Sequence, residues 1–593
     1  MADEIYALPY ADIRNPFSVG ENGAFADYIL RSPEKMPDLV IGSSVLIKDQ
    51  RDGKQIWTVG TVREIKVISP FQMEREHLLY IEDEKSNPNA VLDSGIKGPH
   101  SYQPMLVQVE LDKEITKTEA GDPKFIQSAV QRPPSSASKL FFPKVLPEAN
   151  AEDPSLQEML DIRQEGLKFG AVGFGNAPYE KDGKFLVYRW DIDKLDNKHV
   201  FIVGQSSSGK TLFLKNLASE IRLHDKKTRI IMTDLQGDIS QLLLPDLVNS
   251  IAAVGWQARI SRSAQKEALD ALGPFRLIIP VSNEGDSDEV VALQTLAERR
   301  DVDVQRIGLR LQDLSNPSDV EYLFRVVSEQ VAMLLDEEAQ DLRNKSTPVT
   351  IPALREAVQN MLRTQQRQSV TGSGGTVYFI TTAQAALRAL INLSGYFDFH
   401  QPSMERATNP LDTFNFNGTT ILYLEHLDYE ERQMWEMQLV NWLYAHKKDP
   451  WEAFVFFDEA HDVVPKKSPS KEGKETFFRL RKTFERLARE GRKFGIHLVL
   501  STQSPQDLHE IVPQQCDTRI VMKIDPKNAE VAYLDKNLAL IANSFGRGQF
   551  WCLSPLNGTA NWVRLHSWVP ALPHSKMTPF WERIKAAAVQ GST

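Results

Sequence analysis

The segment HVFIVGQSSSGKTLFLKNLASEI, residues 199–221, contains residues whose types and spacing suit phosphate binding. Gly204, Gly209, Lys210 and Thr211 satisfy the pattern G-x-x-x-x-G-K-[ST]. In this pattern the glycines let backbone N–H groups converge on phosphate oxygens, the lysine reaches the β- and γ-phosphates, and the threonine hydroxyl can ligate Mg²⁺. We therefore expect an ATP site that is formed by Gly204, Gln205, Ser206, Ser207, Ser208, Gly209, Lys210, Thr211 and Leu212.

Two acidic residues follow an apolar run in AFVFFDEAHDVVP. The run delivers Asp458 and Glu459 to the carboxyl end of a strand, where α/β sheets place ligands. Asp458 is the candidate Mg²⁺ ligand, directly or through water, and Glu459 is the candidate base that polarises the attacking water. The alternative explanation is a helix amino terminus, which favours acidic residues.

Other polar residues also end apolar runs. Gln503 in HLVLSTQSP can sense the γ-phosphate or orient water, and its alternative role is to cap a strand end. Asp234 in IIMTDLQGD ends a strand as well, and a loop-capping carboxylate is as good an interpretation as a site residue.

A basic helix end, in RLRKTFERLAREGRKFG, lies between the acidic strand and the strand that precedes Gln503. Arg489 and Arg492 stand beside the turn from Gly491 to Gly495, a place from which a guanidinium could reach a neighbouring subunit's nucleotide. Basic residues in the last turn of a helix also complement its dipole, so both explanations stay open.

A parallel α/β sheet is needed to bring these residues together. Val200–Val203 predicts a strand, the spacing of Leu212, Leu214 and Leu217 predicts a helix, and TRIIMTDLQGDISQL continues the alternation. We expect the sheet to be formed by residues 179–283 and 371–540.

A helical insertion is predicted at residues 284–370, between the two parts of the sheet. In SDVEYLFRVVSEQVAMLLDEEAQDL the apolar residues fall on one helical stripe, which a capping box of Ser318 and Glu321 would begin. The segment TGSGG, residues 371–375, would close the insertion.

The flanking regions carry no catalytic cluster. Residues 1–112 contain short β-rich runs separated by turn signals, which predict a small barrel or sandwich that serves assembly. Residues 113–178 are read as a linker because their first part is rich in Pro and Ser. Residues 541–593 are read as a β-rich or extended segment that braces a neighbouring subunit.

Composition limits the class of protein. The 593 residues carry a net charge of −10, so no global basic field points to nucleic acid or to an anionic membrane. Two cysteines, Cys516 and Cys552, are too few for a disulfide framework or a zinc site. The chain shows no signal peptide and no apolar run of eighteen residues, so we expect a cytoplasmic protein with no membrane partner.

The order of the motifs GQSSSGKT, TDLQGDISQL, FVFFDEAH and LAREGRKFGIHLVLSTQSP resembles the HerA branch of the HerA/FtsK ATPases, over roughly residues 180–570. The resemblance implies an α/β fold with a RecA-like P-loop ATPase core, an N-terminal β-barrel and a helical-bundle insertion. It also implies a hexameric ring that binds ATP and Mg²⁺ between subunits and threads double-stranded DNA through its pore.

The same resemblance assigns roles to individual residues. It implies that Lys210 and Thr211 bind phosphate and metal, that Asp458 and Glu459 serve metal binding and hydrolysis, and that Gln503 senses the γ-phosphate. Lys198 falls where family members often have an arginine that acts in a neighbouring subunit's site. Lysine at this position weakens that assignment, because a point charge cannot make a bidentate contact.

A basic segment, VVPKKSPSKEGKE, follows the acidic strand. Its lysines would grip DNA phosphates without reading base sequence, and a ring would repeat them six times around one axis. A solvated surface loop is the alternative, because Glu472 and Glu475 dilute the charge. The candidate DNA-contacting residues are Lys466, Lys467, Lys471 and Lys474.

Two functions are compatible with these features. The first is a DNA-translocating or unwinding ATPase that works with a partner nuclease or other effector, as HerA proteins do with NurA-type partners, in a setting such as anti-phage defence. The second is an ATPase scaffold that assembles and activates an effector, such as a sirtuin-like NAD-consuming enzyme or a nuclease. A conjugation or secretion ATPase is disfavoured, because no membrane segment is seen in the sequence.

Overall fold

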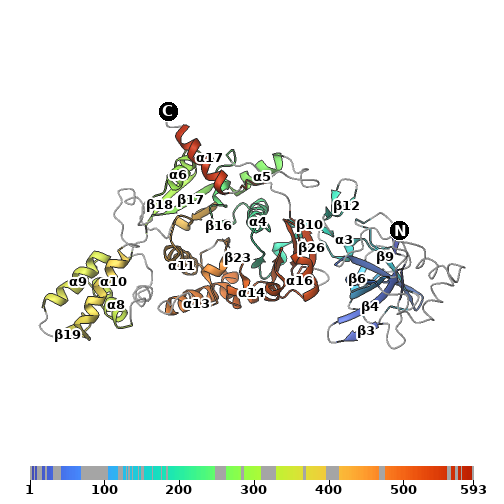
Figure 1. Cartoon of the computed structure of the whole chain (residues 1–593), viewed down its shortest axis with the longest axis horizontal. Coiled ribbons are helices and arrows are strands. Elements are labelled where there is room, and N and C mark those ends of the chain that lie inside the picture. Colours follow the sequence, from blue (N-terminus) through green and yellow to red (C-terminus); the bar gives the residue numbers. More distant parts are fainter. Residues whose placement is uncertain are drawn as a thin grey trace. The chain divides into compact units, whose positions relative to one another are not determined.

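The computed structural model in Figure 1 divides the chain into two compact units, one of residues 1–195 with 523–567 and one of residues 196–522 with 568–593. We call them the antiparallel-sheet unit and the parallel-sheet unit, and describe each by itself. The residues that the structure describes are 3–5, 7–9, 17–20, 23–30, 42–67, 105–117, 125–128, 130, 134–135, 138–144, 146–147, 153–162, 165–174, 177–181, 184–247, 262–281, 286–308, 311, 329–364, 369–394, 413–449, 451–466, 474–556, 562–567, 572–575 and 577–590.

A sheet of parallel strands forms the centre of the parallel-sheet unit. Neighbouring strands all pair in parallel, and most of their residues are buried, as expected for a sheet covered on both faces. Their order is β24 (Thr518–Val521), β15 (Val200–Val203), β23 (Ile496–Thr502), β22 (Ala453–Phe457), β16 (Arg229–Asp234), β21 (Thr419–Tyr423), β17 (Phe275–Pro280) and β18 (Asp303–Ile307).

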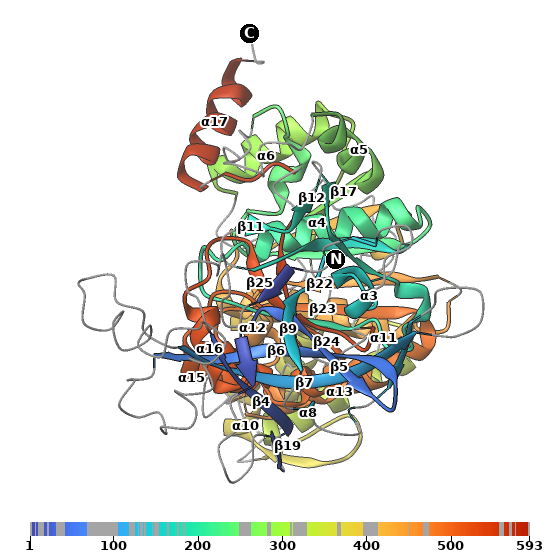
Figure 2. The ribbon, with the colours of Figure 1, turned by 90° about the vertical axis from the view of Figure 1, so that its right-hand side faces the viewer.

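Helices cover this sheet. The helix α4 (Lys210–His224) packs with α5 (Arg262–Leu272), and α11 (Tyr429–Ala445) packs with α13 (Lys474–Glu490). Figures 1 and 2 show α4 and α13 on opposite sides of β23. A capping box of Asp428 and Glu431 begins α11. This doubly covered parallel sheet is the α/β organisation that the sequence predicts.

The acidic strand and the Gln503 strand lead into short elements at the same edge of the sheet. After β22 comes α12 (Ala460–Val463), and after β23 come the 3-10 helix η10 (Pro505–Asp507) and α14 (Ile511–Gln515). A second 3-10 helix, η9 (Gly491–Phe494), joins α13 to β23 at the opposite edge.

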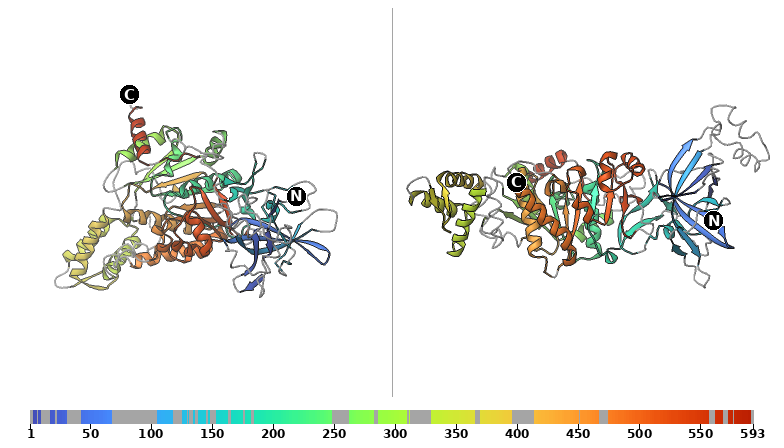
Figure 3. Two further views of the ribbon diagram at one scale, coloured as in Figure 1. Left: turned by 45° about the vertical axis from the view of Figure 1, so that its right-hand side comes forward. Right: turned by 90° about the horizontal axis from the view of Figure 1, so that it is seen from below.

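The helical insertion has other limits than the sequence suggests. The sheet continues past residue 284, because α6 (Asp288–Glu298) leads to β18, whose residues are mostly half-buried and show no apolar run. The helices α8 (Glu329–Asn344), α9 (Ile351–Thr364) and α10 (Ile380–Leu393), shown in yellow in Figure 3, pack on one another. The hairpin β19 (Ser369–Thr371) and β20 (Val377–Phe379) precedes α10, and the sheet resumes at β21. Ser318 and Glu321 lie outside the described residues.

Among the described residues, the first sheet of the antiparallel-sheet unit, shown in blue in Figure 3, contains nine strands. Its order is β1 (Asp3–Ile5), β9 (Lys139–Phe142), β5 (Ser44–Arg51), β6 (Lys54–Val67), β7 (Met105–Lys117), β4 (Gly23–Leu30) and β2 (Ala7–Pro9), with β3 (Phe17–Gly20) on β4 and β8 (Phe125–Ser128) on β7. One residue separates β1 from β2 in the chain, so the two ends of the sheet are close together. A closed barrel stays a prediction.

Further strands of the antiparallel-sheet unit pair with one another outside its first sheet. Among them, β10 (Leu167–Phe174) pairs with β11 (Ala177–Pro178), β14 (Val187–Trp190) and β26 (Val563–His566), and β26 pairs with β25 (Gln549–Leu553). Short elements around these strands are β12 (Glu180–Lys181), β13 (Lys184–Phe185), η3 (Ile192–Lys194), α3 (Leu156–Met159), α15 (Pro526–Ala529), η11 (Glu530–Ala532) and α16 (Lys536–Asn543).

Two further expected boundaries differ from the structure. The expected linker at 113–178 contains the end of β7 and all of β8, β9 and β10, because strands this short give little periodic signal. The expected β-rich or extended segment at 541–593 ends in the helix α17 (Met577–Gln590), which packs on α6 of the same chain. Within the described residues, no helix is long and apolar enough to cross a bilayer.

Candidate functional site

The phosphate-binding loop follows β15 at the carboxyl edge of the sheet. A Cβ on Gly204 would lie 2.7 Å from Ser208 Oγ and 2.8 Å from Met522 Cβ, so only glycine fits there. Gly209 has a φ of 107° and is the N-cap of α4, a conformation that favours glycine. The loop therefore ends at the amino terminus of a fifteen-residue helix, whose N–H groups and dipole suit an anion.

The two polar residues that begin α4 face different partners. Lys210 is buried, and its Nζ donates to the carbonyl oxygens of Gly204 at 2.8 Å and of Gln205 at 3.3 Å. Thr211 Oγ1 lies 3.4 Å from Asp458 Oδ2, which joins the loop to the strand two positions away in the sheet. Lys210, the expected phosphate ligand, is therefore next to Thr211, and Thr211 lies beside Asp458, the other expected metal ligand.

Asp458 directly follows β22 and is almost completely buried. Its Oδ1 accepts hydrogen bonds from Ser501 Oγ at 2.5 Å and from the Glu459 backbone N–H at 3.1 Å. Burial raises the pKa of Asp458, and the negative charge of Glu459 adds to this effect. A cation beside Asp458 and Thr211 would oppose both, and a hydroxyl with a carboxylate oxygen is a donor set that suits Mg²⁺.

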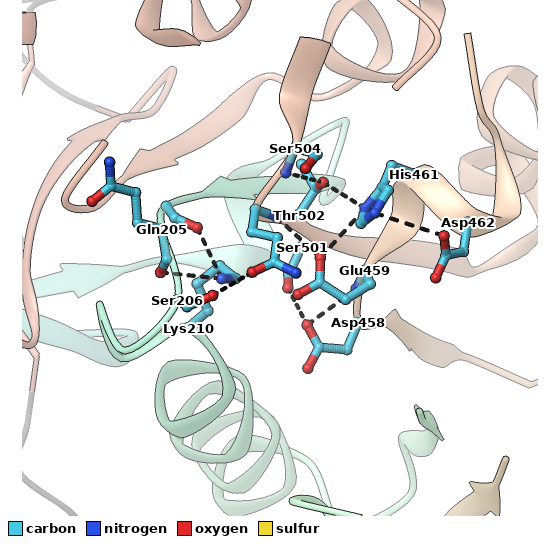
Figure 4. A network of polar contacts seen from close by, with 12 residues as sticks. Gln205, Ser206, Lys210, Asp458, Glu459, His461, Asp462, Ser501, Thr502 and Ser504 are labelled. Atoms are coloured by element: carbon cyan, nitrogen blue, oxygen red, sulfur yellow. Dashed lines mark hydrogen bonds and ion pairs between the residues drawn. The ribbon is translucent and has the colours of Figure 1, made fainter. Parts of the chain in front are cut away.

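Glu459 lies between Lys210 and His461 in Figure 4. Its backbone is left-handed, with φ 53° and ψ 50°, an uncommon conformation for a residue with a side chain. Its Oε2 accepts from the Gln503 backbone N–H at 3.1 Å and lies 3.3 Å from His461 Nδ1. Burial would raise the pKa of Glu459, but the contacts with His461, Lys210 and Gln503 outweigh it and hold this pKa below its usual value.

Gln503 connects the loop to the acidic residues. Its side-chain Oε1 accepts from Ser206 Oγ at 2.5 Å, and its backbone N–H contacts Glu459. Because Ser206 belongs to the phosphate-binding loop, the Gln503 side chain lies directly over that loop. This placement suits a γ-phosphate sensor, and it differs from a residue that only caps its own strand.

Three polar residues of this site have no assigned role in the sequence patterns. Ser501 contacts Asp458, and Thr502 Oγ1 lies 3.0 Å from His461 Nδ1. Ser501 and Thr502 precede Gln503 in the same polar strand tip, STQS, and His461 belongs to DEAH. Their role could be inferred from the strand geometry, because adjacent residues of a strand point to opposite faces and so Ser501 and Thr502 can contact different partners.

Two buried groups near α4 serve packing. Asp234 Oδ2 accepts from the backbone N–H of Ser240 at 2.7 Å and from its hydroxyl at 2.5 Å, which caps the loop after β16. Lys215 is fully buried and donates to the carbonyl oxygen of Pro573 at 2.8 Å. Burial lowers the pKa of Lys215 to about 8, although the charges of Asp238, Asp234 and Asp458 oppose this.

The residues expected to act on a neighbouring subunit's nucleotide lie at the opposite, amino edge of the sheet. Arg489 is exposed in the last turn of α13, and Arg492 is exposed in η9, just before β23. Lys198 precedes β15, and its Nζ lies 2.8 Å from Glu452 Oε1 in the same chain. Strands of four to seven residues, together with the residues that flank them, separate the two edges by about 20 Å, so none of these residues can reach its own chain's loop.

A buried histidine, His199, links α13 to β23 at this amino edge. His199 Nδ1 accepts from the Leu498 backbone N–H at 2.9 Å, and its Nε2 lies 2.9 Å from the carbonyl oxygen of Ala488, near the end of α13. Burial lowers the pKa of His199 to about 3, so this ring is neutral near pH 7. The helix end that carries Arg489 is thereby fixed to the sheet.

The basic segment that follows α12 is described only at its ends. Lys466 is exposed, and its backbone N–H donates to the Asp507 carbonyl oxygen at 2.5 Å. Lys474 begins α13. Lys467 and Lys471 lie outside the described residues.

Comparisons with known proteins give partial similarities. No model of a protein family matches the chain. A probable helicase of Methanocaldococcus jannaschii is 32% identical over 108 residues, which are 17% of this chain and 20% of that protein. The chain therefore matches only one fifth of the length of this curated relative.

Among solved structures, the bacterial conjugative coupling protein TrwB is 13% identical, with a TM-score of 0.40 over 71% of this chain and 92% of its own. VirB4 of Thermoanaerobacter pseudethanolicus is 11% identical, with a TM-score of 0.41 over 70% of this chain and 98% of its own.

The fold and the site together define the class of protein. In the parallel sheet, a G-x-x-x-x-G-K-T loop connects β15 to α4. An acidic pair follows β22, which lies two positions from β15 in the sheet. This is the organisation of a P-loop nucleotide-binding core.

Proposed function

We propose that this chain is an ATPase that hydrolyses Mg²⁺-ATP at the carboxyl edge of its parallel sheet. The observation that carries the proposal is the convergence of Lys210, Asp458, Glu459 and Gln503, which come from three separate segments, around one phosphate-binding loop. A fortuitous glycine turn would not bring a base and a metal ligand to the same place.

Each residue has a chemical role in the proposed reaction. The loop and Lys210 bind the phosphates, and Thr211 with Asp458 would hold Mg²⁺, which would supply positive charge against the charge of the phosphates. Glu459 takes a proton from the attacking water as the water oxygen bonds to the γ-phosphorus. The bond from that phosphorus to the bridging oxygen breaks, and its electron pair remains on ADP.

The wider proposal is a ring, of six copies by the HerA resemblance, that moves or unwinds double-stranded DNA. It rests on the order of the motifs and on the short similarity to a probable helicase. The position of Arg489 and Arg492 supports a shared site, because exposed guanidinium groups at the amino edge can act only on another copy. A partner nuclease or defence effector remains part of this proposal.

Mixed rings test the shared site. Arg489→Ala or Arg492→Ala mixed with Lys210→Ala is expected to regain ATPase activity at interfaces that combine two intact halves. The same mixture with Lys198→Ala tests Lys198, whose pairing with Glu452 predicts the weaker effect. Turnover is measured in rings whose mixed composition is verified by mass. No recovery above the separate variants would contradict a site between subunits.

DNA binding is tested through the basic segment. Changing Lys466, Lys467, Lys471 and Lys474 to Ala is expected to weaken duplex binding equally for unrelated sequences and to leave basal ATPase largely intact. Each lost phosphate contact should flatten the slope of log K against log salt by about 0.9. A matched control replaces four exposed lysines elsewhere, Lys226, Lys227, Lys523 and Lys527. Equal slopes for both variants would exclude this segment as the DNA grip.

The second candidate function is an ATPase scaffold that activates a partner effector. The acidic net charge of −10 favours it over a general affinity for nucleic acid. Absence of duplex binding by the wild type at low salt, with retained ATP hydrolysis, would support the scaffold.

A further inference from the structure

A histidine beside the proposed base has contacts that the ATPase proposal leaves unexplained. His461 lies on α12, and its side chain is 19% exposed. Its Nδ1 is 3.3 Å from Glu459 Oε2 and 3.0 Å from Thr502 Oγ1, and its Nε2 is 3.6 Å from Asp462 Oδ1 (Figure 4). Nδ1 therefore faces two oxygens. The Glu459 carboxylate needs a proton on Nδ1, whereas the Thr502 hydroxyl can donate its own proton only to an Nδ1 that has none.

The two contacts of Nδ1 depend on its proton. Without a proton, Nδ1 is an acceptor, so it takes a hydrogen bond from the Thr502 hydroxyl and repels the carboxylate. Nε2 keeps its proton toward the Asp462 carboxylate, so a second proton on Nδ1 makes the ring cationic and Nδ1 a donor, and Glu459 becomes its stronger partner. Thr502 is set up for the first arrangement, because its Oγ1 already accepts from the Ser504 backbone N–H at 3.1 Å and its own proton can go to His461.

We propose that His461 is a positioning residue for Glu459: the charged ring holds the carboxylate, and the neutral ring turns to Thr502 and frees the carboxylate to act on water. This inference rests on the proposed ATPase function and deepens it. Since Thr502 adjoins Gln503, which contacts the loop through Ser206, the strand tip that senses the nucleotide would also select the state of His461.

The charges around His461 favour its cationic form. Burial lowers the pKa of His461, but the hydrogen bond to Glu459 and the charges of Asp462, Glu459 and Asp507 outweigh it, and the net pKa lies above its usual value. Two cations act on these acids from other elements, Lys210 of α4 on Glu459 and Arg432 of α11 on Asp462. The charged ring is therefore present up to a higher pH than for a free histidine, and it is lost as the pH rises further.

The first test is the pH profile of ATP turnover by the full chain. In the wild type, kcat should rise in a step above about pH 6.5 as His461 loses its proton. His461→Asn, which keeps a polar side chain but cannot titrate, should lose this step and keep its KM for ATP. His461→Ala removes the ring that holds the carboxylate at low pH, so kcat below the step should rise to the value that the wild type reaches above it, with KM little changed. An unchanged step in His461→Asn would overturn the proposal.

Thr502 provides a matched pair of variants. Thr502→Val removes the hydroxyl that the neutral ring accepts from, so the step should move up by about half to one pH unit. Thr502→Ser keeps the hydroxyl and should leave the step in place. If both variants behave alike, Thr502 is not the partner of the neutral ring.

A second measurement does not need hydrolysis. Ring-labelled histidine followed by NMR, with the His461 signal assigned through His461→Asn, gives its pKa directly. Glu459→Gln removes the paired charge and should lower this pKa, whereas an unchanged value would contradict the contact. If the wild type hydrolyses no ATP but His461 still responds to Glu459→Gln, the proposed function fails and the pairing stands.

Discussion

Replacement of Glu459 by glutamine is expected to slow ATP hydrolysis at least about a hundredfold and to leave ATP binding intact. Glutamine has the same shape, and its side-chain oxygen can still accept from the Gln503 backbone N–H, as Glu459 does at 3.1 Å. It cannot take a proton from water. The loss should therefore appear in kcat and hardly in KM, in steady-state turnover with Mg²⁺-ATP.

The control for this variant is Glu510→Gln, which removes an exposed carboxylate just before α14. It should turn over at the wild-type rate. Nucleotide affinity is measured separately with a slowly hydrolysed ATP analogue. Normal hydrolysis by Glu459→Gln would remove the assignment of Glu459 as the base, and it would point to water activation by the metal site alone.

Replacement of Lys210 by alanine should abolish hydrolysis and also weaken ATP binding, by about tenfold to a hundredfold, since a charged hydrogen bond is lost. Lys210 is buried and donates to the carbonyl oxygens of Gly204 and Gln205, so its ammonium already lies within the loop. The loss of both hydrolysis and ATP binding distinguishes a phosphate ligand from a general base, because the loss of a base lowers hydrolysis and leaves the affinity for ATP unchanged.

Lys227→Ala is the matched control, because Lys227 is an exposed lysine just beyond the other end of α4. It removes the same charge without touching the loop. If Lys210→Ala binds and hydrolyses ATP as Lys227→Ala does, the loop is not the catalytic nucleotide site.

The local features of the site could be predicted from the sequence. The strand at Val200–Val203, the helix that begins at Lys210 and the acidic pair at a strand end all agree with the structure. These features depend on residues close together in the chain, where periodicity and glycine positions act directly on the backbone. The sequence likewise predicts that Arg489 and Arg492 lie at the basic end of a helix.

Tertiary structure decided which of these features meet. The strand order places β23 between β15 and β22, and this puts Gln503 over the loop and Thr502 against His461. Strand order is set by packing between segments hundreds of residues apart, so it cannot be predicted from local sequence patterns. The same holds for α10, which joins the helices α8 and α9, and for Lys198, which lies on the edge opposite to the loop and pairs with Glu452.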